Sequence, residues 1–259
     1  MSQLPRVCSH CSAIVPDGHY YCGRCGSHHA EGEEGGIQVL FYGPMQAPGR
    51  AKLILICGEA IEGMSYHLNA THHHAGRMSG VIPFEDPYIS EQHADFYYVD
   101  NKIYLRDEGS VNGTFLRVRG SVPLQDYDII RAGDHLFRFE RLYVEPPYVY
   151  DDGTTFYASP TADIRFRLIQ ISEGGLQGKA YASPHGEVAV GREGCDLSFP
   201  DDVHLSVKHF SVSDADDAII LTDHNSKNGT FLRIRDSVQL QHGDYLFIGE
   251  QLMRVEIAV

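Results

Sequence analysis

The feature that most constrains the fold is an internal repeat that spans most of the 259-residue chain. A shift of 116 positions places Asn112-Gly-Thr-Phe-Leu-Arg on Asn228-Gly-Thr-Phe-Leu-Arg, and the match continues without a gap to Glu140 and Glu256. A repeat of this length is a whole domain, which excludes a solenoid of short repeats. The sequence therefore predicts one domain present twice.

Each copy contains short runs of β-branched and aromatic residues separated by turn signals such as Asn-Gly. No amphipathic helix of ten or more residues is evident, so the pattern predicts an all-β fold with two β-sandwiches in tandem. The clearest expected strands are Ala51–Ile56, Phe96–Val99, Lys102–Arg106, Ile164–Ile171 and Ala218–Leu221.

Four of the six cysteines form two pairs, Cys8-x2-Cys11 and Cys22-x2-Cys25. Two such knuckles match the tetrahedral preference of zinc, and four thiolates leave no open position for catalysis. A segment of about 25 residues cannot bury a sufficient core, so the metal would supply most of its folding energy. The pattern resembles a small N-terminal zinc ribbon with one structural Zn²⁺ per chain. An iron site of rubredoxin type and a redox pair are the alternatives.

The remaining cysteines, Cys57 and Cys195, are expected to be buried free thiols. No apolar stretch approaches the roughly 18–20 residues that a membrane span needs. The first residues also lack the pattern of a secretory signal. These observations favour a cytoplasmic protein with no membrane segment.

The expected domain organisation follows the repeat and the composition between its copies. The segment between the copies is rich in Pro and Tyr, with an acidic Asp151-Asp152 pair, as in a linker. We expect a ribbon at 1–28, a linker at 29–50, a first sandwich at 51–142, a linker at 143–162 and a second sandwich at 163–259.

The charge balance restricts the partners. The chain has 21 Lys or Arg against 35 Asp or Glu, a net charge of −14. A broad nucleic-acid-binding surface needs clustered positive charge, and the ribbon segment supplies only Arg6 and Arg24. Any anion site must be local, and the acidic surroundings favour ligands with neutral or basic flanks.

One ordered set of short motifs carries the chemistry. The second copy contains Gly191-Arg192, then Ser206-x-x-His209, then Ser226-Lys227-Asn228-Gly-Thr. The first copy contains the same elements at Gly76-Arg77, Ser90-x-x-His93 and Ser110-Val111-Asn112-Gly-Thr. This order and spacing resembles the forkhead-associated (FHA) domain, a reader of phosphothreonine peptides, over both copies.

The resemblance implies that the arginine and serine contact the phosphate, that the asparagine holds the peptide main chain, and that His209 and His93 brace the loops. Such roles are physically reasonable, because a phosphate dianion needs a planar cationic fork and several donors on a rigid scaffold. The expected phosphopeptide-binding residues are Arg192, Ser206, Lys208, Lys227 and Asn228 in the second copy and Arg77, Ser90 and Asn112 in the first.

Two departures from the family pattern distinguish the copies. Family members often carry Arg or Asn directly after the motif serine, where this chain has Val207 and Glu91. Glu91 would place a like charge beside the dianion, whereas Lys208 or Lys227 can compensate for Val207. Because Val111 replaces Lys227 in the first copy, we expect the second copy to be the main reader.

Other candidate sites receive structural interpretations. Ser206 and His209 lack a nucleophile elbow, which argues against hydrolase chemistry. His72-His73-His74 is expected in an exposed loop. The alternating arginines of the Asn-Gly-Thr segments are expected on a solvated strand face: Arg117, Arg119, Arg233 and Arg235.

The sequence thus predicts a non-enzymatic adaptor that binds a threonine-phosphorylated protein or a Ser/Thr kinase in bacterial kinase signalling. A phospho-independent scaffold built on degenerate FHA domains is the alternative. Thr154-Thr155, after the acidic pair in the linker, is a candidate phosphorylation site. The identity of the partner and self-association stay open.

Overall fold

The fold is described from a computed structural model of the chain. The described residues are 6–7, 14–15, 21, 48–58, 61–78, 80–143, 148–159, 164–215 and 218–258. Regular structure within them is β-strand, apart from one 3₁₀ turn, η1, at Glu173–Gly175. The all-β prediction is confirmed for this part of the chain. No helix within it is long and apolar enough to cross a bilayer.

Two short strands precede the repeats, β1 (Arg6–Val7) and β2 (Ile14–Val15), and they pair antiparallel. The predicted zinc ligands lie outside the described residues: Cys8, Cys11, Cys22 and Cys25.

In its described residues each repeat contributes ten strands in the same order, and all five clearest expected strands are confirmed within two residues. The first repeat supplies β3 (Ala51–Cys57), β4 (Ser65–Leu68), β5 (His72–Arg77), β6 (Ile82–Phe84), β7 (Ala94–Val99), β8 (Lys102–Asp107), β9 (Thr114–Arg117), β10 (Ser121–Pro123), β11 (Ile129–Ala132) and β12 (His135–Arg141). The second supplies β13 (Phe166–Ile171), β14 (Gln177–Tyr181), β15 (Glu187–Gly191), β16 (Leu197–Ser198), β17 (Phe210–Ala215), β18 (Ala218–Asp223), β19 (Thr230–Arg233), β20 (Val238–Gln239), β21 (Tyr245–Ile248) and β22 (Gln251–Ile257).

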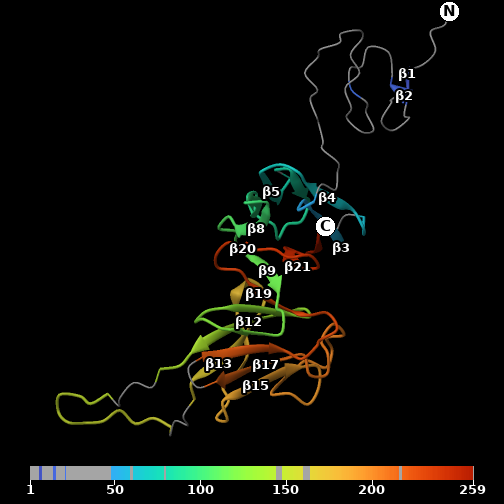
Figure 1. The fold of residues 1–259 in the computed structure, drawn as a ribbon. Helices are drawn as coiled ribbons and strands as arrows, with labels where there is room; N and C mark the ends of the chain where they lie inside the picture. The colour runs from blue at the N-terminus through green and yellow to red at the C-terminus, as the bar shows by residue number, and fades with distance from the viewer. Residues whose placement is uncertain are drawn as a thin grey trace, which may run out of the picture.

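The two repeats exchange their last three strands. One five-stranded sheet has the order β20-β8-β7-β5-β6, and the other has β10-β18-β17-β15-β16. A ten-stranded sheet, β14-β13-β12-β11-β19-β9-β21-β22-β3-β4, runs through both halves of the molecule. In Figure 1 the red strands β20 and β21 accordingly lie with β3, β5 and β8, while the green β12 lies with β13, β15 and β17.

The hydrophobic cores confirm the exchange. One core combines residues from β3–β8 of the first repeat with six from the end of the second: Ile234, Leu240, Leu246, Ile248, Met253 and Val255. The other core combines residues from β13–β18 with the six equivalent positions of the first repeat: Val118, Leu124, Ile130, Ala132, Phe137 and Phe139. Burial of each large apolar side chain contributes about 1.5–3 kcal/mol, so both halves depend on strands from both repeats.

In the ten-stranded sheet the two halves join where β9 pairs with β19, with Leu116 opposite Leu232. Within each half, strands of the two repeats also pair with each other, as β22 does with β3 and β12 with β13. The boundaries 51–142 and 163–259 therefore delimit the sequence repeats, but each sandwich is assembled from both of them.

Because of the exchange, the segment between the repeats does not connect two separate sandwiches. Arg141 at the end of β12 lies directly opposite Phe166 at the start of β13. A short turn would suffice to join these two positions. Within the intervening residues, 148–159 form a hairpin with Val149 opposite Thr155, and all of its residues are exposed. Figure 1 shows this hairpin apart from the sandwiches, and we name it the arm.

Three local expectations were wrong. Cys57 is exposed and Cys195 is half-buried, because both lie at strand ends or turns rather than in a core. The three adjacent histidines lie in β5 instead of a loop, so alternation buries His73 and leaves His72 and His74 exposed.

Candidate functional site

The loops that carry the predicted phosphate-binding residues of the second repeat lie together. The backbone N–H of Arg192, at the end of β15, donates to the carbonyl of Ser206 at 2.9 Å. The backbone N–H of Lys227 donates to the Ser206 Oγ atom at 3.1 Å. Asn228 Nδ2 donates to the carbonyl of His204 at 2.8 Å. Three separate loops thus place the predicted arginine, serine and asparagine in one neighbourhood.

The first repeat forms the same arrangement. The N–H of Arg77 donates to the carbonyl of Ser90 at 2.9 Å, and the N–H of Val111 donates to Ser90 Oγ at 3.1 Å. Asn112 Nδ2 donates to the carbonyl of Tyr88 at 2.8 Å. The backbone geometry of the two sites is therefore equivalent, and the side chains must account for any difference in binding.

A buried histidine joins the loops of each site. The backbone N–H of Ser206 donates to His209 Nδ1 at 3.1 Å, and His209 Nε2 lies 3.1 Å from the carbonyl of Gly229. Burial lowers the pKa of His209 and outweighs the opposing effect of the Gly229 carbonyl. His93 makes the equivalent contacts in the first repeat, and burial lowers its pKa too. Both histidines are placed to brace the loops.

An aspartate fixes the turn that carries each asparagine. Asp223 accepts hydrogen bonds from the hydroxyl groups of Ser226 at 2.5 Å and Thr230 at 2.6 Å. Burial raises the pKa of Asp223, but these hydrogen bonds outweigh that effect and hold the pKa below its ordinary value. Asp107 plays the same part for Ser110 and Thr114. These hydrogen bonds fix the backbone of the turn that carries the asparagine.

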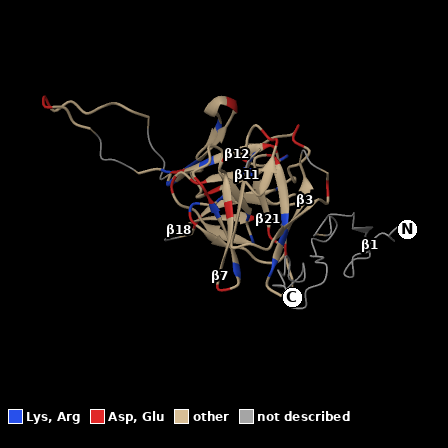
Figure 2. Ribbon diagram, turned by 90° about the horizontal axis from the view of Figure 1, so that it is seen from above, with Lys and Arg blue, Asp and Glu red and all other residues tan. Residues whose placement is uncertain are grey.

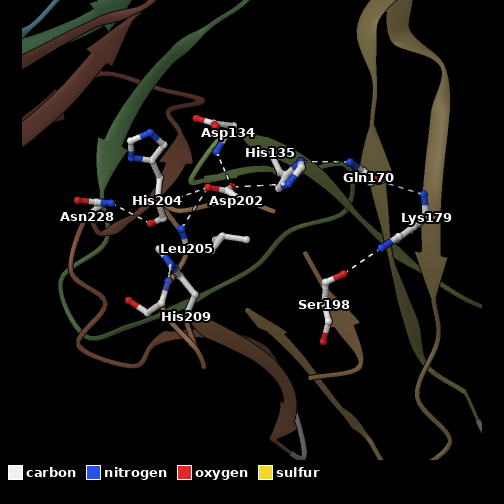
Figure 3. Close-up of polar contacts among 11 residues, drawn as sticks. Asp134, His135, Gln170, Lys179, Ser198, Asp202, His204, Leu205, His209 and Asn228 are labelled. Carbon is white, nitrogen blue, oxygen red and sulfur yellow. Dashed lines mark hydrogen bonds and ion pairs between the residues drawn. The ribbon is translucent and has the colours of Figure 1, made fainter. Parts of the chain in front are cut away.

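A second buried aspartate, which the sequence reasoning missed, orients the serine loop. Asp202 accepts the backbone N–H of His204 at 2.7 Å and of Asp134, on the β11–β12 turn of the other repeat, at 2.9 Å. His135 Nε2 lies 3.6 Å from the same carboxylate (Figure 3). Asp86 is equivalent in the first repeat and accepts from the N–H of Glu250. The 116-residue shift aligns the two aspartates, which is the signal that could have found them.

The added cations of the second repeat occupy different surroundings. Lys208 Nζ lies 3.7 Å from a carboxylate oxygen of Glu187, and both side chains are about half exposed. Lys227 is exposed directly beside Asn228. In the first repeat, Val111 is exposed at the position of Lys227, and Glu91 is exposed next to Ser90. The two sites therefore differ in side-chain charge.

The alternating arginines do not form a simple solvated face. Arg119 forms an ion pair with Asp244, and its Nε atom lies 2.9 Å from that carboxylate. Arg235 pairs with Asp128 in the equivalent way. Both pairs join loops of different repeats, because the exchange brings these segments together. Arg117 and Arg233 reach the asparagine-bearing turn of the opposite repeat.

Charge elsewhere matches the acidic composition. Figure 2 shows Asp and Glu distributed over both halves and at the tip of the arm, where Asp151 and Asp152 lie. Thr154 and Thr155 are exposed on the same arm.

Comparison with known proteins finds the same family model in both repeats. The FHA domain model matches residues 74–133 and 188–249, one match in each repeat. A comparison with curated proteins found no match.

Several solved structures resemble parts of the chain. The FHA domain of the CT664 protein of Chlamydia trachomatis is 14% identical, covers 81% of this chain and 99% of its own, and has a TM-score of 0.33. EmbR of Mycobacterium tuberculosis, solved with a low-affinity phosphopeptide, is 29% identical over 35% of this chain, with a TM-score of 0.24; the match spans 24% of the EmbR chain. A structure from a study of phosphothreonine-dependent FHA domain interactions is 26% identical over 35% of this chain and 95% of its own, with a TM-score of 0.23. The FHA domain model thus matches one segment in each of the two repeats.

Proposed function

We propose that this chain is a non-catalytic adaptor that binds threonine-phosphorylated proteins, with the loops of the second repeat as the main reader. The observation that carries the proposal is the convergence of Arg192, Ser206 and Asn228 from three loops onto one surface. A site of this kind can meet a phosphate with a planar cation and a hydroxyl donor, and a peptide backbone with an amide.

The use of Ser206 supports this role. Its Oγ atom accepts the N–H of Lys227, so its hydroxyl proton points elsewhere and can be donated to a phosphate oxygen. The half-buried Arg192 follows β15 and is anchored to the serine loop through its backbone. A scaffold held this rigidly loses little conformational entropy when it binds a ligand.

Side-chain charge favours the second repeat over the first. Lys227 adds a cation next to Asn228, whereas the first repeat has Val111 there and adds Glu91 beside its serine. Lys208 is the weaker candidate of the two lysines, because Glu187 lies 3.7 Å from its ammonium group. We assign Lys227 as the additional phosphate-attracting residue.

The signalling context follows from this chemistry. The ligand is a threonine-phosphorylated protein, such as a substrate of a Ser/Thr kinase or the kinase itself, in the cytoplasm.

The Cys8, Cys11, Cys22 and Cys25 set would bind one structural zinc ion.

The test is a titration of the full chain with a degenerate phosphothreonine peptide library. Matched phosphoserine and unphosphorylated libraries serve as controls. We expect phosphothreonine-dependent binding that Arg192→Ala abolishes and Arg77→Ala leaves largely intact. Equal binding of phosphorylated and unphosphorylated peptides would contradict the proposed phosphothreonine-dependent recognition.

A phospho-independent scaffold is the second candidate, and the arm is the observation that favours it. Tyr148, Tyr150, Phe156 and Tyr157 of the arm are all exposed. Exposed aromatic clusters of this kind often mark protein interaction sites. Binding of a partner that survives Arg192→Ala together with Arg77→Ala, but is lost when the arm is shortened, would favour the scaffold.

A further inference from the structure

The pairing of β9 with β19 brings each repeat to the recognition turn of the other. In this antiparallel pair, Arg117 at the end of β9 lies opposite Phe231, close to the start of β19. The turn that carries Asn228 immediately precedes β19. By the same pairing, Arg233 lies opposite Phe115, close to the turn that carries Asn112.

The side chains use this proximity. Arg117 Nη2 donates to the carbonyl of Ser226 at 3.4 Å. A Cβ atom built on Gly229 would lie only 2.3 Å from Arg117 Nε, so the guanidinium packs directly on the glycine backbone. The Arg117 Cζ atom also lies 5.5 Å from the centroid of the Tyr245 ring.

The contact is reciprocal. Arg233 Nη2 donates to the carbonyl of Ser110 at 3.4 Å, and a Cβ on Gly113 would lie 2.2 Å from Arg233 Nε. Two independent copies of the same arrangement argue that it is a property of the paired repeats rather than of one loop.

Both turns are the ones that present the peptide-binding asparagines. Within the second turn, the N–H of Gly229 donates to Ser226 Oγ and the N–H of Lys227 donates to Ser206 Oγ. Arg117 contacts this turn at the carbonyl of Ser226 and at Gly229, which are the residues on either side of Lys227 and Asn228. The guanidinium therefore contacts both ends of the turn that carries Asn228.

We infer that the two recognition sites are composite: Arg117 is a positioning residue for the second repeat's site, and Arg233 is one for the first repeat's site. The inference rests on the proposed function for its effect on peptide affinity. Neither arginine needs to touch the phosphate, since each acts through the turn of the opposite repeat.

Affinity provides the first test. In the full chain carrying Arg77→Ala, Arg117→Ala should weaken phosphothreonine-peptide binding by on the order of 3- to 10-fold, the loss expected for one hydrogen bond of ordinary strength. Arg117→Lys should restore part of it. Arg119→Ala is the matched control, because it removes an ion pair between the repeats that lies away from the turn. Unchanged affinity in Arg117→Ala, or an equal loss in Arg119→Ala, would overturn the inference.

Amide hydrogen exchange provides a readout without ligand. Arg117→Ala should speed exchange at Lys227 and Gly229, and Arg233→Ala should speed exchange at Val111 and Gly113. A uniform acceleration in both turns by either variant would indicate general destabilisation and overturn the crosswise assignment. If no phosphopeptide binds the parent chain, the proposed function fails, while the exchange experiment still decides whether the arginines position the turns.

Discussion

His209 Nδ1 accepts the backbone N–H of Ser206 at 3.1 Å, so this ring nitrogen carries no proton in the folded chain. The other ring nitrogen lies 3.1 Å from the carbonyl of Gly229 and is therefore the donor. A second proton on the ring would face the Ser206 N–H and separate the loops. The geometry thus demands a neutral imidazole.

Stability should fall in mild acid. Burial lowers the pKa values of His209 and His93 from the ordinary 6.5. Below about pH 6.5 the unfolded chain binds these protons first. The stabilising contribution is therefore complete above that pH and is lost as the pH falls through the lower folded values. Thermal melts between pH 8 and pH 5 should show a declining midpoint.

Replacement of both bracing histidines gives the control. His93→Asn with His209→Asn should lower the midpoint at pH 8 and flatten its dependence on pH. The slope should not vanish, because burial also lowers the pKa values of His73, His135 and His224. A slope identical to that of the parent chain would refute the assignment to these two residues.

Gly229→Ala should destabilise the protein more than Gly243→Ala. Both glycines have positive φ angles, +87° and +83°, so each alanine carries a strain of roughly 1–2 kcal/mol. Only at Gly229 would the new methyl group also meet the Arg117 side chain, since a Cβ on Gly243 meets nothing within 4 Å. Chemical denaturation measures the free energy of unfolding of both variants.

A double variant isolates the contact. Adding Arg117→Ala to Gly229→Ala should remove the extra loss and leave only the backbone strain. If the two changes are simply additive, the guanidinium does not pack on this glycine.

Separate expression of the halves tests the strand exchange. We expect fragments 1–152 and 153–259 to co-purify as a one-to-one complex, because each fragment lacks three strands of the sandwich that it begins. Size-exclusion chromatography with light scattering reports the mass. Two folded monomers that do not associate would contradict the exchange.

Metal analysis tests the predicted ribbon. The purified chain should contain one zinc ion, and Cys22→Ser should lose it. Cys57→Ser is the control that should keep zinc, since Cys57 is an exposed free cysteine at the end of β3. Iron in place of zinc would indicate a rubredoxin-type site, and a metal-free chain would refute the ribbon.

The sequence predicted most of the local structure because strand and turn signals are local. It placed the five clearest strands, since alternation and turn residues depend on neighbouring positions. The bracing role of His93 and His209 was expected only from the family resemblance. It could not predict the exchange, because both repeats carry the same Thr-Phe-Leu-Arg strand in β9 and β19. β11 pairs with β19 and β21 pairs with β9, but from the sequence pattern either strand could pair equally well with β9 or with β19.

Side-chain size distinguishes the exchanged strands, but only in three dimensions. Ala132, Phe137 and Phe139 in one core correspond to Ile248, Met253 and Val255 in the other. Cores are packed closely enough that such volumes are not interchangeable. The missed roles of Asp202, Arg117 and Arg233 have the same origin, because their partners belong to the other repeat.

Shared cores also change what the gene can do over time. Ordinary tandem domains can be deleted, duplicated or transplanted one at a time, because each half of the gene encodes a complete folding unit. Here a segment that encodes one repeat encodes two incomplete cores. The two repeats should therefore be inherited together. Selection on a core residue of one repeat should depend on the residues of the other repeat that pack against it.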